Sequence, residues 1–391
     1  MDKIEKMKKL ASEQLHGMAD LWLSMDAGPG KGFGRVDGFG RRVPDAPRTA
    51  VDMGRVLYAL SAAYRASGRE EYRKGADDAF RYIKNVMTDP VFGGVFVQVG
   101  TDGDVKFTEK RSYEQAFCLY GLAEYVLMGG DPEALELAKN MVGLLEKARG
   151  AKTGYDECWS RDWSETVAGE AKARKAGLGE YSLDSQSHVI EAYGNLYKAW
   201  PDEGLRRRLA QLTRLACDKL FIASVGKAGQ RFDIDWELVS DDESYGDNPE
   251  VSYFFYDAAC AVGDAELIRR TADMAAALTD RSVSTGLDPV YGGLFDRTAG
   301  GKLNDVKIWW NQCEIINGCL NAYRLTGEER YLDTAAGVWD FIEKYMILED
   351  GTWRARVQRD GTPLPMPEAP SGTVCPYHIM RTCVRTLETL K

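Results

Sequence analysis

The chain has 391 residues and a formal net charge of −10 at neutral pH, from 50 basic and 60 acidic side chains. An acidic balance of this size argues against nucleic acid or an anionic membrane surface as a partner. No segment approaches the roughly 20 consecutive apolar residues of a membrane helix, and residues 1–6 lack the apolar run of a secretory signal. We therefore expect a cytoplasmic protein.

Helical segments joined alternately by short and long links follow one another along the whole chain. The short links are residues 67–69, 129–131, 201–203, 263–264 and 326–328. The long links are rich in glycine, which is typical of loops. If the helices run up and down, every long loop lies at the same end of the molecule, where a site can be built.

Two kinds of helix are predicted from the spacing of apolar residues. Residues 72–83, 137–148 and 331–342 carry apolar side chains three or four positions apart, which indicates outer helices with one buried face. The segments after the long loops have apolar residues around more of the circumference, so we expect them to be inner helices. They begin near Asp52, Ser112, Asp184, Pro249, Ile308 and Pro376.

An internal repeat supports this arrangement. The sequence DPVFGGVF at residues 89–96 returns as DPVYGGLF at residues 288–295, which indicates a shared structural unit. The later residues Lys110, Tyr113 and Gln115 likewise return as Lys307, Trp310 and Gln312. About twelve helices in six antiparallel hairpins are too many for one bundle. We predict an all-α fold, an α/α toroid with its long loops at one end, formed by residues 1–391 as a single domain.

Eight cysteines are scattered among apolar residues, without a CxxC pair or a tight framework. Free, buried thiols in a reducing compartment are therefore expected, for example at Cys118, Cys260 and Cys319.

Unusual polar and aromatic residues gather near the starts of all six predicted inner helices. They are Arg55, Tyr113, Gln115, His188, Asp247, Glu250, Trp310, Gln312, Glu314, His378 and Arg381. A helix cap would explain any one of them, but six such groups together indicate a site. Unpaired N–H groups at helix starts would also favour an anion there.

Histidine is scarce, with three in the chain. His16 lies in the first outer helix, where a packing or surface role is expected. His188 and His378 each open an inner helix, so both are candidate acid/base residues. No HxxxH, HExxH or Cys/His cluster is present, so we expect no metal and no other cofactor.

Several spaced motifs resemble the N-acylglucosamine 2-epimerase family, which includes cellobiose 2-epimerases and aldose–ketose isomerases. The matching segments span nearly the whole chain, at residues 54–57, 113–117, 154–157, 187–193, 244–250, 309–314 and 376–381. The resemblance implies an α/α toroid that interconverts free sugars at C2 without a metal, through ring opening and an enediolate. The implied substrate is a sugar of the mannose, glucose or fructose type, or a 4-linked disaccharide. The sequence leaves open whether chains pair, so we expect a monomer or homodimer.

The resemblance also implies residue roles. His378 would be an acid/base residue at C2, His188 would act in ring opening or in protonating O1 or O5, and Arg55 would stabilise the enediolate oxygens. Glu250 and Glu314 would hydrogen-bond the histidines or sugar hydroxyls.

One departure from the family pattern affects the chemistry. Where relatives read Ser-Tyr-Gly-His, this chain has Asp247 in place of the second acid/base histidine. A carboxylate with a reference pKa of about 3.9 is a weaker base than imidazole unless burial raises its pKa. The Asn-Thr-His of relatives is also replaced, by Asp-Ser-Gln at residues 184–186, which suggests different substrate contacts.

Two alternatives remain open. Toroids also host glycoside hydrolases, which use two carboxyl groups about 5 to 9.5 Å apart; Asp247, Glu250, Glu314 and Glu157 could supply such a pair. The second alternative is a sugar-binding protein without turnover. Aromatic rings could cover a pyranose in each case, at Tyr113, Tyr245, Trp309, Trp310 and Trp353, with Gln312, Lys307, Glu314 and Arg381 addressing hydroxyls. The loops at 151–183 and 223–248 are expected to decide the substrate.

Overall fold

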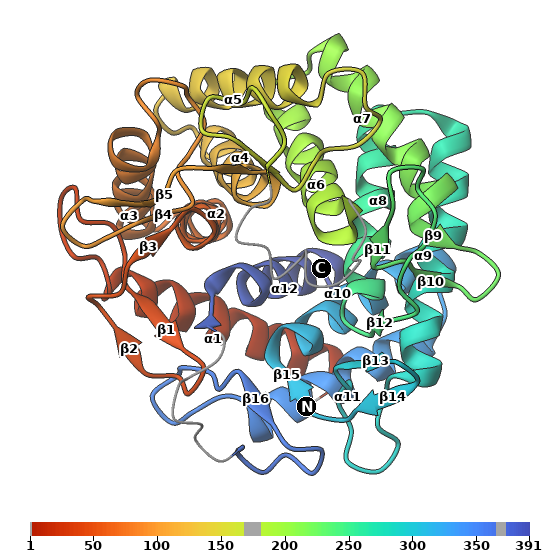
Figure 1. The fold of residues 1–391 in the computed structure, drawn as a ribbon. Helices are drawn as coiled ribbons and strands as arrows, with labels where there is room; N and C mark the ends of the chain where they lie inside the picture. Colours follow the sequence, from red (N-terminus) through yellow and green to blue (C-terminus); the bar gives the residue numbers. More distant parts are fainter. Residues whose placement is uncertain (1, 168–180, 365–372) are drawn as a thin grey trace.

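The computed structural model describes residues 2–167, 181–364 and 373–391 (Figure 1). These described residues form twelve α-helices. They are α1 (Lys3–Leu23), α2 (Ala50–Ser67), α3 (Glu70–Tyr82), α4 (Ser112–Leu127), α5 (Glu133–Arg149), α6 (Leu183–Ala199), α7 (Glu203–Leu215), α8 (Asp247–Val262), α9 (Ala265–Thr285), α10 (Trp309–Thr326), α11 (Glu329–Tyr345) and α12 (Pro376–Thr389). A single π turn extends α3, η1 (Ile83–Met87), and another extends α7, η3 (Ala216–Leu220).

The even-numbered helices form a closed inner ring. Each packs against the next, from α2 through α4, α6, α8 and α10 to α12, and α12 packs back on α2 (Figure 1). The helices α3, α5, α7, α9 and α11 each pack against the inner helix before them, while α1 packs against α12. The predicted α/α toroid is confirmed, and the N-terminal helix completes its sixth hairpin.

Local sequence explains the two kinds of helix. In α3 the buried residues follow one face, at Tyr72, Ala76, Ala79 and Phe80, whereas α4 buries every residue from 114 to 125. The inner helices begin at or within two residues of the predicted positions. Three short links turn through a left-handed glycine after the helix, such as Gly68 with φ 71°, a position that favours glycine because it has no Cβ.

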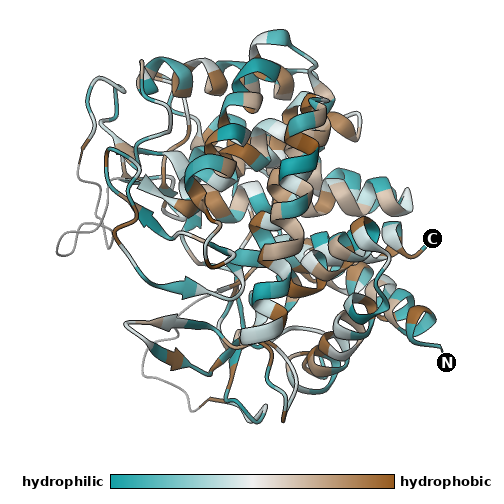
Figure 2. Ribbon diagram, turned by 90° about the vertical axis from the view of Figure 1, so that its right-hand side faces the viewer, coloured by the Kyte–Doolittle hydropathy of each residue, from teal (hydrophilic) through white to brown (hydrophobic). Residues whose placement is uncertain are grey.

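Seventeen short strands occupy the long loops within the described residues, at the end opposite the two termini (Figure 2). They are β1 (Arg35–Asp37), β2 (Arg42–Val43), β3 (Arg48–Thr49), β4 (Gln98–Val99), β5 (Val105–Phe107), β6 (Lys110–Arg111), β7 (Cys158–Trp159), β8 (Tyr181–Ser182), β9 (Phe221–Ile222), β10 (Lys227–Ala228), β11 (Arg231–Phe232), β12 (Glu243–Ser244), β13 (Arg297–Ala299), β14 (Lys302–Asn304), β15 (Lys307–Ile308), β16 (Arg356–Val357) and β17 (Thr373–Val374). The sequence did not predict them, because two or three residues are too few to show an alternating pattern.

These strands join each loop to the next around the ring. The strand directly before each inner helix pairs antiparallel with a strand of the following loop. The six pairs are β3 with β4, β6 with β7, β8 with β11, β12 with β13, β15 with β16, and β17 with β1. The start of every inner helix is therefore tied to a neighbouring loop, which holds the side chains of the first helical turns in place.

The internal repeat forms two buried ion-pair triads. In each triad, one aspartate accepts a hydrogen bond from a fully buried lysine at about 3 Å and a second hydrogen bond from the Nε of an arginine. The first triad is Asp89 with Lys110 and Arg161, and the second is Asp288 with Lys307 and Arg359. Each aspartate also caps the following turn by accepting from backbone N–H groups. The repeat thus anchors two loops, and both lysines serve the fold.

Among the cysteines named above, Cys118 and Cys319 are free and buried, as predicted. Cys260 is exposed, which corrects that part of the prediction, because it lies at the exposed end of α8. Among the described residues, no helix has the length and apolar character needed to cross a bilayer.

Candidate active site

A cavity of about 510 Å³ lies at the loop end of the ring. Eight of the predicted site residues line it, and together they come from all six inner helices. They are Arg55, Tyr113, His188, Asp247, Glu250, Trp309, Trp310 and His378. The ring therefore brings residues more than 300 positions apart in the sequence to one sugar-sized hollow.

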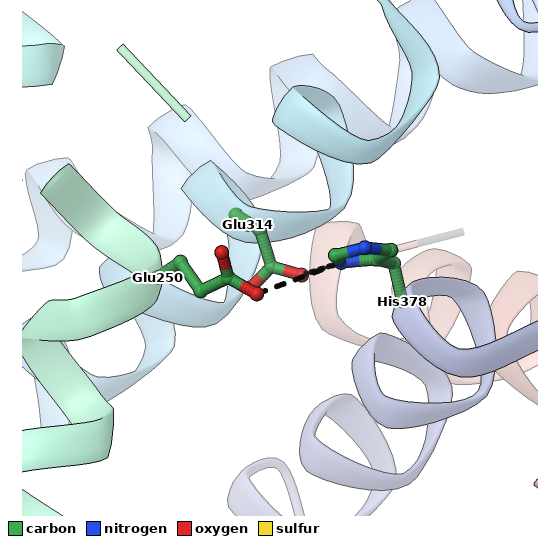
Figure 3. Close-up of side chains that lie close together, drawn as sticks. All are labelled: Glu250, Glu314 and His378. Atoms are coloured by element: carbon green, nitrogen blue, oxygen red, sulfur yellow. Dashed lines mark hydrogen bonds and ion pairs between the residues drawn. The ribbon is translucent and has the colours of Figure 1, made fainter. Parts of the chain in front are cut away.

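His378, in the first turn of α12, is held by a carboxylate behind it. Its Nδ1 lies 2.6 Å from Glu314 Oε1 and 3.8 Å from Glu250 Oε1 (Figure 3). Burial opposes ionisation of Glu314, but the Arg381 guanidinium and the His378 hydrogen bond hold its pKa well below the usual range. An ionised Glu314 accepts a hydrogen bond from Nδ1–H, so His378 Nε2 carries no proton and is left as a proton acceptor.

Burial lowers the pKa of His378 below its ordinary value, although Glu314 acts in the opposite direction. The imidazole is therefore neutral near pH 7, as a general base must be. Trp309 approaches this ring edge-on, with the ring centroids 5.3 Å apart. The indole keeps solvent from one side of the histidine and fixes its orientation.

His188, on α6, has a similar support. Its Nδ1 lies 3.0 Å from Glu191 Oε2, one helical turn along the same helix. Glu191 in turn accepts a hydrogen bond from the Tyr377 hydroxyl at 2.6 Å. In the inner ring α6 lies opposite α12, so the two histidines stand on opposite walls of the cavity.

Arg55 brings an uncompensated positive charge to the cavity. Its Nη2 donates to the Tyr113 hydroxyl at 3.1 Å, and its guanidinium lies 4.2 Å from the centre of the Phe117 ring. Among the described residues, no carboxylate lies within ion-pair distance of it. Arg55 is therefore available to an anionic oxygen in the cavity.

Asp247, at the start of α8, faces the cavity beside the wall that Asp184 contributes from α6. Burial, together with the charge of Asp184, raises the pKa of Asp247 to about 7, while Arg297 acts in the opposite direction. An ordinary aspartate is ionised at this pH. Asp247 can instead hold or release a proton near neutrality.

Three predicted substrate contacts lie outside the cavity lining. Gln312 uses its amide on the backbone of Leu294, accepting from N at 2.7 Å and donating to O at 2.8 Å. Gln115 binds Val95 in the same way in the other repeat. Glu314 and Arg381 are buried behind His378. The placement of Gln312, Glu314 and Arg381 therefore does not support direct contact between these residues and a sugar.

The other suggested contacts also have structural roles. Lys307 is buried in its triad, the Trp353 indole donates to Gln14, and Tyr245 packs in the core. Their burial away from the cavity lining corrects the expectation that they cover or bind a sugar. Glu157 is likewise engaged, by the hydroxyls of Ser182 and Ser185.

Glu250, Glu314 and His378 have donor atoms within 4.8 Å of one another, the arrangement of a possible cation site. Arg381 Nη2, however, lies 2.7 Å from Oε1 of both glutamates. The guanidinium already supplies the positive charge that these carboxylates need. The donor set therefore fits an arginine-bridged cluster better than a metal centre.

Several residues of the cavity wall were not among the predicted site residues. They are Ser182, Asp184, Gln230, Ser240, Asp242 and Arg297. Loop 223–248 contributes to the lining, and its effect on substrate choice stays a prediction. Residues 168–180 of loop 151–183 lie outside the described part of the chain.

The fold and the cavity define an α/α toroid with candidate acid/base residues around one hollow. The profile of the N-acylglucosamine 2-epimerase family matches residues 32–382. The chain belongs to this family, which confirms the resemblance drawn from its motifs.

Relatives of known structure or activity cover the whole chain. A cellobiose 2-epimerase of Bacteroides fragilis is 30% identical over 99% of this chain and 100% of its own. The structure of a cellobiose 2-epimerase from Bacillus thermoamylovorans has a TM-score of 0.90 at 30% identity, covering 98% of this chain and 99% of its own. A D-mannose isomerase, at 18% identity and a TM-score of 0.83 over 97% of this chain and 98% of its own, shares the fold. The glycoside hydrolase alternative is not favoured.

Proposed function

We propose that the protein interconverts a reducing sugar at C2 by two-base proton transfer, with His378 and Asp247 as the two acid/base residues. The observation that carries this proposal is their shared cavity. They stand on α12 and α8, separated in the inner ring by α10, so they can address a bound sugar from different sides. One is a neutral base, and the other holds a proton near pH 7.

The reaction needs four groups. His188, oriented by Glu191, assists opening of the sugar ring. His378 Nε2 then takes the C2 proton. The electron pair of the C2–H bond forms a C1=C2 double bond while the π pair of the C1=O1 carbonyl moves onto O1, and Arg55 stabilises the resulting enediolate. Asp247 delivers its proton to the other face of C2, so the product is the epimer. His378 has then gained one proton and Asp247 has lost one.

A 4-linked disaccharide such as cellobiose is the substrate we favour, because relatives named for that activity match over the full chain. Trp309 and Trp310 give the cavity flat apolar surfaces suited to the C–H face of a pyranose. Mannose and glucose are the smaller candidates. If His378 returns the proton to C1, the product is a ketose. We further propose a cytoplasmic monomer or homodimer.

The proposal is tested by incubation with cellobiose, mannose, glucose and fructose in D2O, followed by NMR. Deuterium at C2 together with a new epimer is the expected result for at least one sugar. Cleavage of cellobiose would instead indicate a hydrolase. Saturable binding of a sugar without exchange would indicate a binding protein that has lost turnover.

A further inference from the structure

Arg381 joins carboxylates from three inner helices with one guanidinium. Its Nη1 lies 2.6 Å from Glu191 Oε1, and its Nη2 lies 2.7 Å from both Glu250 Oε1 and Glu314 Oε1. The arginine side chain is 3% exposed and each of its partners is 7% exposed or less. It also lines a second cavity, of about 410 Å³, formed by the opposite halves of the inner helices. Arg381 thus lies beneath the floor of the catalytic cavity.

Two of these carboxylates are the ones that hold the two histidines. Glu191 Oε2 contacts His188 Nδ1 at 3.0 Å, and Glu314 Oε1 contacts His378 Nδ1 at 2.6 Å. Each contact in the series from His188 to His378 is therefore a hydrogen bond of 3.0 Å or less, with Arg381 at its centre. Such a network couples groups that no direct contact joins.

We propose that Arg381 is a positioning residue that sets the tautomer of both histidines at once. This inference rests on the roles that the proposed function gives to His188 and His378. A nearby guanidinium favours the ionised form of the carboxylates it contacts. An ionised carboxylate can only accept, so each histidine places its proton on Nδ1 and leaves Nε2 open.

Loss of the guanidinium would reverse this arrangement. Three carboxylates around one point cannot all stay ionised in a buried site, so protons would enter the cluster. A protonated Glu314 would donate to His378 Nδ1, which moves the ring proton to Nε2. His378 could then no longer accept the C2 proton. Glu191, which holds His188 Nδ1, would lose the same guanidinium partner.

The other charged groups around the cluster do not replace Arg381. The charged or titratable side chains are Asp247 on α8, Arg55 on α2 and Arg385 on α12, and the neutral hydroxyls of Tyr120, Tyr253 and Tyr377 also face the cluster. Arg385 forms an ion pair with Asp257 at 2.8 Å. Arg55 lines the catalytic cavity, whereas Arg381 lies beneath its floor. Burial and the charge of Glu314 raise the pKa of Glu250, against the effect of Arg381. The pKa values of the two glutamates are thus shifted in opposite directions, upward for Glu250 and downward for Glu314.

The three histidines of the chain allow a direct test by NMR of protein labelled with 15N-histidine. Native protein should show Nδ1–H tautomers at His188 and His378, and Arg381→Gln should change both while His16 serves as an internal reference. Arg385→Gln, one turn further along α12, is the matched control and should change neither. A response at only one histidine, or at none, would overturn the coupling. This readout does not require turnover.

The pH profile of C2 exchange provides a second test. Arg381→Gln should shift the acid limb of the profile to a higher pH, by about one unit or more, because the carboxylates lose the cation that favours their ionised form. Activity should recover at alkaline pH. Glu191→Gln removes a negative charge and should move the limb downward; it also keeps the test open if Arg381→Gln does not fold. An acid limb that stays in place in both variants, or moves in the same direction, contradicts the proposal. If native protein shows no exchange while both tautomers respond, the proposed function fails and the positioning role stands.

Discussion

Asp247 shows how the surroundings of a residue can replace its type. A histidine titrates near neutrality by its own chemistry, whereas here burial and the charge of Asp184 bring an aspartate to a pKa of about 7. Asp184 lies in the neighbouring inner helix, α6. The two carboxylates therefore act together, because the charge of Asp184 helps to make Asp247 a proton donor.

The epimer yield should fall as the pH rises through about 7. Asp247 must carry a proton to deliver it to C2, and ionisation removes that proton, whereas His378 remains neutral throughout this range. The epimer formed per C2 exchange event, followed by NMR between pH 5.5 and 8.5, measures the effect. Asp247→His should shift or flatten this dependence and raise the epimer yield at pH 8. A product ratio that does not vary with pH would remove Asp247 from the second transfer.

Replacing His378 by asparagine should lower C2 exchange by about 10²- to 10⁴-fold, the usual contribution of a general base. His16→Asn is the matched control, since His16 lies on α1 away from the cavity and contacts the Tyr72 hydroxyl. Deuterium exchange rates at saturating sugar, with circular dichroism to verify folding, give the comparison. Near-native exchange in His378→Asn would assign the proton transfer to another group.

At the scale of elements, the two aspartate triads hold the loops that precede α4 and α10. Each buries a lysine whose charge depends on one carboxylate. Burial opposes ionisation of Asp288, but its bonds from Arg359, a backbone N–H and Lys307 hold its pKa well below the usual range. The stabilisation is therefore fully present above the unfolded value of about 3.9 and is lost as the pH falls below it.

Asp288→Asn should lower the free energy of unfolding by about 3 to 5 kcal/mol, because it leaves Lys307 buried without its counter-ion. Asp89→Asn should cost a similar amount in the equivalent triad. The control is Asp104→Asn, in an exposed pair with Lys106, where the change should stay within about 0.5 kcal/mol. Urea unfolding curves measure all three. Equal costs for Asp288→Asn and Asp104→Asn would contradict the structural role of the triad.

The predictability of these elements follows from their length and surroundings. The inner helices could be placed from the sequence because each runs for several turns after a glycine-rich loop. The role of Gln312 could not, since an amide at a helix start fits a sugar and a loop backbone equally well. Glu191 could have been found, because it follows His188 by three residues as Glu250 follows Asp247. Arg381 could not, because its partners come from three helices far apart in the sequence.

For the whole molecule, ring closure joins the first helix to the last. The N-terminal α1 packs along α12, which carries both His378 and Arg381. The stability of the chemical site thus depends on contacts made by residues near the start of the chain. A closed ring also gives a reason to expect one cooperative unit, as the single-domain prediction requires.

Leu15→Ala, in the buried face of α1, should lower stability by about 2 to 5 kcal/mol through the cavity it leaves. Unfolding of this variant and of the native protein should remain a single transition, with tryptophan fluorescence and circular dichroism coinciding. Two separated transitions would contradict the single-domain prediction.

The most direct test of two-base transfer is deuterium labelling of cellobiose in D2O by native protein and by Asp247→Asn. Native protein should give a C2 epimer that carries deuterium at C2. Asp247→Asn should still exchange the C2 hydrogen of the starting sugar through His378, but form no epimer. Equal epimer formation by both proteins, or an absence of C2 deuterium in native reactions that form the epimer, would contradict the account.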